Sequence, residues 1–132
     1  MSESRIESFE KFWPFYVREH SKKATRVLHF VGTTSAAAVL GAAIATRNPK
    51  LIPLALVAGY GPAWISHFFI EKNRPATFTY PVWSLLADLK MWTKIASGTM
   101  DAEVEKAMAE VRTPEPEPAP APRNGVAHSE LN

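Results

Sequence analysis

Two apolar segments joined by a short polar turn decide the fold of this chain. Residues 28–46 read LHFVGTTSAAAVLGAAIAT, residues 47–50 read RNPK, and residues 51–70 read LIPLALVAGYGPAWISHFFI. Neither apolar segment carries a formal charge when its histidine is neutral. A helix of this length is about 28 Å long, close to the hydrocarbon thickness of a bilayer. The pattern therefore predicts a membrane helical hairpin with candidate spans at 28–46 and 51–70.

Small residues recur at intervals of four along both segments, a spacing that lets helix backbones approach closely in a membrane. Because alanine and glycine insert into lipid less strongly than leucine, a buried hairpin in a soluble helical bundle stays open as an alternative. The small residues at this spacing are Gly32 with Ala36, Gly41 with Ala45, and Ala55, Gly59 and Ala63.

Basic residues flank the hairpin unequally. The turn carries Arg47 and Lys50, whereas six basic side chains lie at the opposite ends of the two segments. Because cytoplasmic flanks carry the excess of Lys and Arg, this pattern predicts that both termini are cytoplasmic. The expected location is the inner membrane of a bacterium or the endoplasmic reticulum of a eukaryote. The six basic residues are Arg18, Lys22, Lys23, Arg26, Lys72 and Arg74.

An aromatic amphipathic helix is expected over residues 4–19, ahead of the hairpin. Ser4 and Glu7 match a capping box at its start. Its apolar side chains fall at helical spacing, and two aromatic pairs suit a membrane interface, although a core-facing helix fits equally well. The pairs are Phe12-Trp13 and Phe15-Tyr16.

A second amphipathic helix is expected after the hairpin, with Thr79 as its N-cap and Pro81 in its first turn. Its apolar face runs from residue 82 to 96 and suits an interfacial or partner-packing helix. Residues 101–111 predict a short charged helix, and the alternating prolines after them predict a disordered tail over 113–132. The predicted fold is all-α, with a single helical membrane domain over residues 1–112.

Composition excludes several classes of protein. The chain has no cysteine, which rules out disulfides, a thiolate nucleophile and Cys-ligated metals. Its net charge of +2, from 15 basic and 13 acidic residues, is too small to indicate nucleic-acid binding. The first ten residues are polar and of mixed charge, so no cleavable signal peptide is expected.

Three histidines are predicted to meet at one membrane face. His29 lies 19 residues before Asn48 and His67 lies 19 residues after it, so a hairpin centred on Asn48 places the two imidazoles at one depth. His20 lies on the same side of the membrane, and the short connection after it allows it to fold back. Three neutral imidazoles suit Fe(II) or another first-row divalent metal. Histidines that only hydrogen-bond across the hairpin are the alternative.

Charged residues near the same face extend the candidate site. Glu71 follows His67 by four residues, and it or Asp88 is a candidate to complete the metal shell or to orient the histidines. Arg74 is expected at the level of the lipid headgroups. There it could hold a carboxylate by a bidentate pair, or only extend its charge toward water.

Several motifs resemble the membrane 2-hydroxy fatty-acid dioxygenase family, over about residues 9 to 97. They are Glu19-His20, the octapeptide RVLHFVGT at 26–33, the run AWISHFFIEKNRPAT at 63–77, and Ser84-Leu85. The resemblance implies an Fe(II)-dependent oxygenase of fatty-acid α-oxidation, which shortens a 2-hydroxy fatty acid by one carbon with molecular oxygen.

The resemblance also assigns roles to residues. His20, His29 and His67 carry over as the iron ligands, and Glu71 and Arg74 are candidate catalytic residues within the motif. The chain departs from longer members in having two candidate spans, and from some members in having one histidine at position 20. A membrane scaffold or lipid-binding protein with structural histidines is the alternative function.

Overall fold

The computed structural model describes residues 5–112, and this part of the chain is all-helical. The predicted fold class is thereby confirmed. The predicted tail and the capping role of Ser4 lie outside the described residues. The helical elements in chain order are α1 (Phe9–Glu19), α2 (Lys23–Ala45), η1 (Pro49–Leu51), α3 (Ile52–Ile65), η2 (Ser66–Glu71), η3 (Ala76–Phe78), α4 (Pro81–Ala96) and α5 (Met100–Arg112).

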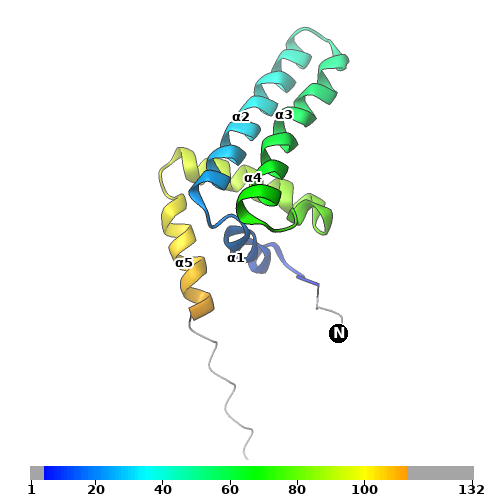
Figure 1. Cartoon of the computed structure of the whole chain (residues 1–132). Coiled ribbons are helices and arrows are strands. Elements are labelled where there is room, and N and C mark those ends of the chain that lie inside the picture. The colour runs from blue at the N-terminus through cyan, green and yellow to red at the C-terminus, as the bar shows by residue number, and fades with distance from the viewer. Residues whose placement is uncertain (1–4, 113–132) are drawn as a thin grey trace, which may run out of the picture.

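The antiparallel hairpin of α2 and α3 projects from a base made by α1, α4 and α5 (Figure 1). Its turn lies at the predicted position, where Arg47 adopts a left-handed conformation with φ 53° and the Asn48 side chain accepts a hydrogen bond from the Lys50 amide. Helix α2, the first helix of the hairpin, begins five residues before the predicted span 28–46. The second span is a continuous composite of η1, α3 and η2 over Pro49–Glu71.

Glycine lets the two helices of the hairpin touch through their backbones. A Cβ atom added at Gly32 would lie 2.8 Å from the carbonyl oxygen of Gly59, and one added at Gly59 would lie 3.2 Å from the Cβ of Ala36. The predicted small-residue contact is thus confirmed at these positions. It is wrong for Gly41, because a Cβ there would meet nothing within 4 Å, so this part of the row faces away from α3.

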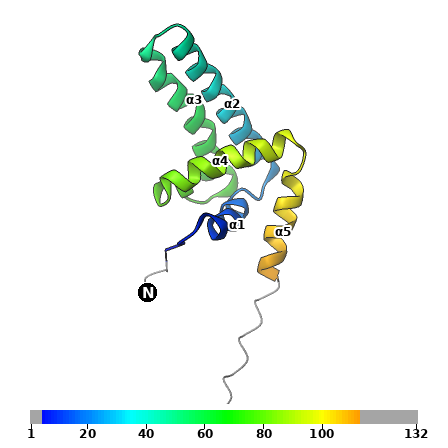
Figure 2. The ribbon, with the colours of Figure 1, turned by 180° about the vertical axis from the view of Figure 1, so that it is seen from behind.

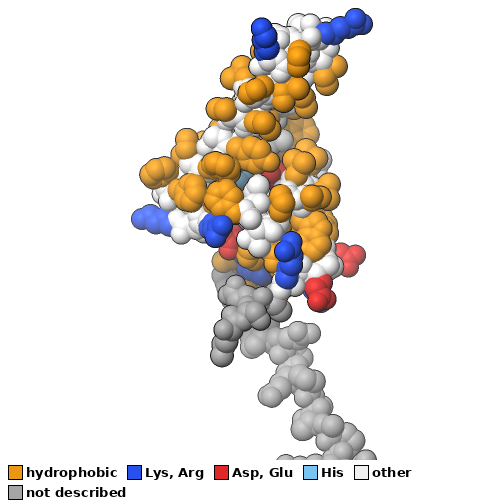
Figure 3. All heavy atoms as spheres, turned by 90° about the vertical axis from the view of Figure 1, so that its right-hand side faces the viewer, with side chains coloured by type: hydrophobic (Ala, Val, Ile, Leu, Met, Phe, Trp, Pro, Cys, Tyr) orange, Lys and Arg blue, Asp and Glu red, His pale blue; other side chains and the backbone are white. Residues whose placement is uncertain are grey.

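Most of the hairpin surface is apolar and uncovered. Two helical segments, Lys23–Ala45 and Pro49–Glu71, are long and apolar enough to cross a bilayer, and only 17% and 22% of their most apolar windows is buried. A core helix of a soluble bundle would be mostly buried. In Figure 3, basic side chains gather at the tip of the hairpin and around its base, with hydrophobic side chains covering the surface between them. These helices indicate association with a membrane.

The base of the molecule has its own hydrophobic core, in which α1 packs against α4 and α5. The aromatic side of α1 faces this core, so the core-facing interpretation of its aromatic pairs describes the structure. The predicted start of this helix is wrong, because residues 5–8 are not helical and α1 begins at Phe9. Ser8, rather than the predicted capping box that includes Glu7, caps it by accepting a hydrogen bond from the Lys11 amide at 3.3 Å. The largest apolar side chains of this core that are fully buried are Tyr16, Phe12, Met91 and Val17.

Helix α4 crosses the foot of the hairpin, as the rear view in Figure 2 shows. It begins after Tyr80 rather than Thr79, with Pro81 in its first turn as predicted. The side that faces the protein carries Ser84, Ala87 and Met91. Its leucine-rich side is exposed instead, as expected for an interfacial helix. The exposed apolar residues of that side are Val82, Leu85, Leu86 and Leu89.

Candidate metal centre

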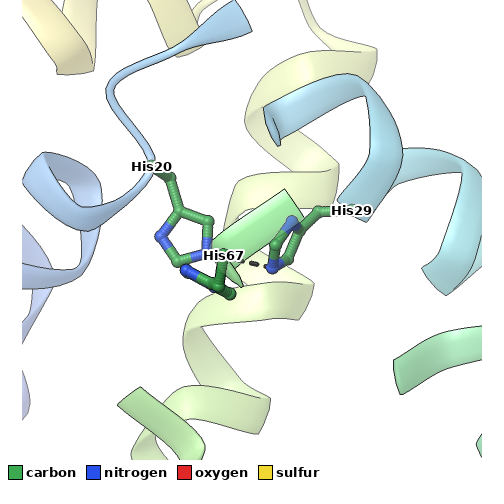
Figure 4. A group of neighbouring side chains, drawn as sticks. All are labelled: His20, His29 and His67. Carbon is green, nitrogen blue, oxygen red and sulfur yellow. Dashed lines mark hydrogen bonds between the residues drawn. The ribbon is translucent and has the colours of Figure 1, made fainter. Parts of the chain in front are cut away.

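Three histidines from three separate elements meet where the hairpin joins the base. His20 ends α1, His29 lies in the second turn of α2, and His67 lies in η2. All three are buried, and their ring centroids are 4.4, 4.6 and 5.0 Å apart. Figure 4 shows the three rings pointing toward one another. The predicted equal depth of His29 and His67, and the return of His20 to the same point, are therefore confirmed.

Hydrogen bonds to backbone carbonyls fix the tautomers of two of these rings. The Nδ1 atom of His20 lies 2.6 Å from the carbonyl oxygen of Tyr16, and that of His29 lies 2.9 Å from the carbonyl oxygen of Thr25. A carbonyl oxygen only accepts, so each Nδ1 carries the proton and donates it. The Nε2 lone pair of each neutral ring is left free.

A side-chain relay fixes the tautomer of His67. Its Nδ1 atom lies 2.7 Å from Oδ1 of Asn73, whose Nδ2 donates to the backbone and carboxylate oxygens of Glu19 at 3.1 and 2.6 Å. Because both Glu19 atoms are acceptors, the Asn73 amide has one allowed orientation. Its oxygen therefore faces His67, and the Nδ1 of His67 is the donor.

The three rings consequently present unprotonated Nε2 atoms to one another. Those of His20 and His29 are only 3.0 Å apart (Figure 4, dashed line). Burial, followed by the neighbouring histidines, lowers the pKa of His20 well below its usual value, so this ring is not doubly protonated. Facing lone pairs repel unless a cation lies between them. Three histidine nitrogens within 4.8 Å of one another have the donor chemistry and spacing to hold a metal ion.

The element that carries His67 is a π-helix, a wider turn that recurs at functional sites. It ends at Lys72, which has φ 57° and donates its amide to the His67 carbonyl. This wider turn changes the direction of Glu71, which regular α-helical spacing predicts on the same face as His67. The motif residues after His67 therefore point to different neighbours.

Glu71 binds the connection between His20 and α2. Its carboxylate accepts hydrogen bonds from the Lys22 amide at 2.7 Å and from the Ser21 hydroxyl at 3.3 Å. Arg26 also holds this connection, since its Nη1 donates to the carbonyls of His20 and Ser21 at 3.0 and 2.6 Å. The structure thus places Glu71 next to the backbone that carries His20.

Arg74 is exposed and its guanidinium carbon lies 5.2 Å from the ring centroid of Phe78. It lines an open groove with Phe68, Lys72, Asn73 and Phe78. The next residue, Pro75, lines the histidine cavity. Arg74 therefore lies at the rim of the histidine site and outside its lining.

Tyr16 and Asp88 support the His20 ring. The Tyr16 ring stacks on His20 with centroids 4.0 Å apart, and its hydroxyl donates to the Asp88 carboxylate. Burial raises the pKa of Asp88 to about 6, against the opposing effect of the Tyr16 hydrogen bond. The sequence marks Asp88 as a candidate, whereas Tyr16, Glu19, Arg26 and Asn73 were missed as supports. The spacing of four between Tyr16 and His20 was the available signal.

A small cavity of about 10 Å³ adjoins the three histidines. The aromatic side chains of Tyr60 and Trp64 on α3 line one side, and Trp64 is 40% exposed on the apolar surface. Ser84 and Asp88 on α4 line another side. The cavity therefore lies between the apolar surface of the hairpin and a polar wall.

Comparison with known proteins identifies one family. The model of the family described as 2-hydroxy-palmitic acid dioxygenase Mpo1-like matches residues 6–100. These residues include the hairpin, α1, α4 and all three histidines of the cluster. Curated proteins and solved structures gave no match.

Proposed function

Because the chain belongs to the 2-hydroxy-palmitic acid dioxygenase Mpo1-like family, we propose that it is an Fe(II)-dependent membrane dioxygenase. Its substrate would be a 2-hydroxy fatty acid, which would react with one molecule of oxygen to give the acid with one carbon fewer, carbon dioxide and water. The observation that carries the proposal is the convergence of three unprotonated Nε2 atoms in a buried cluster whose Nδ1 atoms are all held by acceptors. This arrangement suits a metal rather than a chain of histidine hydrogen bonds.

His20, His29 and His67 would hold the iron. Nitrogen ligands suit first-row divalent metals, and three protein ligands leave coordination positions open. When bound, Fe(II) would supply the redox chemistry with oxygen that the side chains of this protein lack. The carbonyls of Tyr16 and Thr25 and the amide of Asn73 would keep the rings in the tautomer that binds metal, as partners of ligating histidines commonly do.

The substrate would reach the site from the bilayer. Tyr60 and Trp64 join the cavity to the apolar surface of α3, which gives the acyl chain a route that stays out of water. We propose that Arg74, at the rim of the cavity, binds the carboxylate of the substrate by charge-assisted hydrogen bonds. Glu71 would act as a positioning residue, since its carboxylate is engaged with Ser21 and Lys22 next to His20.

The histidine cluster would face the cytoplasm. Lys22, Lys23, Lys72 and Arg74 lie at its end of the hairpin, whereas the turn has Arg47 and Lys50. The larger number of basic residues favours the cytoplasmic side for the base of the molecule, and with it both termini.

Metal analysis and product analysis of detergent-purified protein test the proposal together. We expect one Fe(II) per chain after anaerobic purification and an oxygen-dependent conversion of 2-hydroxypalmitic acid to the acid with one carbon fewer. His67→Ala should lose both iron and product. The matched variant Asn48→Ala, at the far end of the hairpin, should keep both.

Two results would contradict the proposal. A wild-type protein that folds normally but binds no metal under reducing conditions would instead favour a membrane scaffold or lipid-binding role. Full turnover by variants that lack any one of the three histidines would exclude the metal centre as the site of reaction.

A further inference from the structure

Helix α4 directs two polar side chains into the histidine cavity. Ser84 and Asp88 lie one turn apart on the buried side of α4, and both line the cavity. The Ser84 residue is only 1% exposed, and its Oγ atom has no hydrogen-bond partner within residues 5–112. The Asp88 carboxylate accepts one hydrogen bond from Tyr16. Both groups therefore retain hydrogen-bonding capacity toward the cavity.

An unpaired hydroxyl at this position needs an explanation beyond packing. Leaving a buried polar group without a partner costs about 1–3 kcal/mol. The neighbouring buried residues of α4, Ala87 and Met91, are apolar, so an alanine at position 84 would serve packing equally well. The serine hydroxyl is instead positioned to bind a group that enters the cavity.

Size and charge limit which group this can be. A cavity of about 10 Å³ has room for about one oxygen-sized group, comparable to a water molecule. The Asp88 carboxylate can accept a hydrogen bond, but it repels a carboxylate at close range. A hydroxyl can donate to Asp88 and also pair with Ser84. The polar wall of the cavity thus fits a hydroxyl and disfavours an acid group.

We propose that Ser84 and Asp88 bind the 2-hydroxyl group of the substrate and so select 2-hydroxy fatty acids over unsubstituted ones. This inference rests on the proposed function and adds a recognition site to it. In the proposed orientation the 2-hydroxyl of the substrate points into the cavity toward Ser84 and Asp88. Its carboxylate points outward to Arg74, and its acyl chain lies beside Tyr60 and Trp64. A site built to pair a substrate hydroxyl discriminates strongly against the analogue without it, because its own polar groups are then left unpaired.

Equilibrium binding without oxygen tests the inference apart from turnover. The dissociation constants of 2-hydroxypalmitic acid and palmitic acid would be measured for the iron-loaded, detergent-purified protein. We expect the wild type to prefer the hydroxy acid at least tenfold. Ser84→Ala should lower this preference about 2- to 10-fold, as expected for one neutral hydrogen bond. Asp88→Asn should lower it further, because the hydroxyl then loses a hydrogen bond to a charged group, which contributes more than a neutral one.

Matched measurements distinguish this inference from a failure of the proposed function. Thr93→Ala removes an exposed hydroxyl from the same helix and should keep the wild-type preference. Iron content should be unchanged in Ser84→Ala, and its unfolding midpoint should be no lower than that of the wild type, because the substitution removes a buried hydroxyl without a partner. If the wild type converts 2-hydroxypalmitic acid but both cavity variants keep its full preference, the recognition site is wrong and the proposed function stands. If the wild type neither prefers nor converts the hydroxy acid, both are overturned.

Discussion

The amide of Asn73 connects the end of α1 to the His67 ring. Its oxygen lies 2.7 Å from the Nδ1 of His67, while its nitrogen lies 2.6 Å from the carboxylate of Glu19. Glu19 directly precedes His20, so one side chain links the segments that carry two of the three histidines. Burial, and next the charge of Glu71, raises the pKa of Glu19. The Asn73 amide partly opposes that shift by donating to the carboxylate.

Loss of this amide should weaken metal binding. We expect Asn73→Ala to bind Fe(II) about 10- to 100-fold more weakly, the usual effect of removing a partner of a ligating histidine. Without Asn73, the His67 ring is free to rotate and to change tautomer. Anaerobic titration of the purified protein with Fe(II) measures the effect. Asn48→Ala serves as the control, and wild-type affinity in Asn73→Ala would show that the relay does not orient His67.

Close contact between Gly32 and Gly59 should make Gly32→Ala destabilising. The added Cβ would lie 2.8 Å from a backbone oxygen, which cannot move aside without separating the two helices. Overpacking of this kind costs about 1–3 kcal/mol. Thermal unfolding in detergent should therefore show a lower midpoint for Gly32→Ala.

The matched control for this prediction is Gly41→Ala on the same helix. Its Cβ would meet nothing within 4 Å, and alanine is the better helix former by up to about 1 kcal/mol. We expect Gly41→Ala to be neutral or stabilising. Equal destabilisation by the two substitutions would mean that the hairpin does not depend on the Gly32 contact.

Local sequence was enough to predict the hairpin, its turn and the shared depth of His29 and His67. The hairpin and the turn follow from two long apolar segments with four polar residues between them, and the shared depth follows from equal distances to Asn48 along regular helices. The surroundings of Glu71 did not follow, because a π-helix replaces the regular spacing after Ser66. The relay through Asn73 depends on contacts with α1, which lies 54 residues away in the sequence. Local patterns carry no information about such contacts.

Helix α1, with its aromatic pairs, is a second case in which local sequence does not determine the contacts of a helix. Its apolar spacing fits a membrane interface and a core-facing helix equally well, and only the packing of α4 and α5 decides between them. The leucine-rich side of α4 is in turn exposed, while its less apolar side is buried around Ser84 and Ala87. In a soluble protein the hydrophobic face of a helix is expected to be buried. In a membrane protein that face can contact lipid, and the side buried in the protein can be the more polar one.

Glu71 should affect metal affinity more than the chemical step. Because its carboxylate binds Ser21 and Lys22, Glu71→Ala should loosen the connection that carries His20. We expect about tenfold weaker Fe(II) binding, comparable to the loss of other groups that support a ligand. Glu71→Gln keeps one acceptor oxygen, so its affinity for Fe(II) should lie between those of the wild type and Glu71→Ala. Glu105→Ala, on the exposed side of α5, is the control.

A different result for the same variants would indicate that Glu71 takes part directly in the reaction. If Glu71→Gln binds iron with wild-type affinity but loses turnover at saturating substrate, the carboxylate takes part in the reaction. Measurement of iron affinity and kcat on one preparation separates the two roles.

Arg74 should act on substrate affinity alone. We expect Arg74→Ala to raise KM for 2-hydroxypalmitic acid about 10- to 100-fold, since a hydrogen bond to a charged group contributes about 1.5–3 kcal/mol. Iron content should not change, because Arg74 lies outside the lining of the histidine cavity. Lys50→Gln, at the hairpin tip, removes one positive charge as a control. An unchanged KM in Arg74→Ala would contradict a carboxylate-binding role.

The contact between Trp13 and Glu103 should give the docking of α5 an acid dependence. The indole Nε1 donates to the Glu103 carboxylate at 3.0 Å, and this hydrogen bond is the main reason that the pKa of Glu103 lies below its usual value. The folded state therefore binds fewer protons at this site than the unfolded state. The stability it contributes is complete above the ordinary pKa of 4.5 and is lost as the pH falls through the lowered value.

Trp13→Phe keeps an aromatic ring in the core but removes the donor. We expect its unfolding midpoint to lie a few degrees below that of the wild type at pH 7, a shift of about 2–5 °C. Part of this difference should vanish once the pH has fallen through the lowered pKa of Glu103, where the carboxylate is protonated in both proteins. The control repeats the comparison in the Glu103→Gln background, where position 103 cannot titrate. There the difference in unfolding midpoint caused by Trp13→Phe should not depend on pH. A Trp13→Phe deficit that stays constant as the pH falls from 7 through the titration of Glu103 would assign the whole effect to packing, and the hydrogen bond would then contribute nothing to holding α5 against α1.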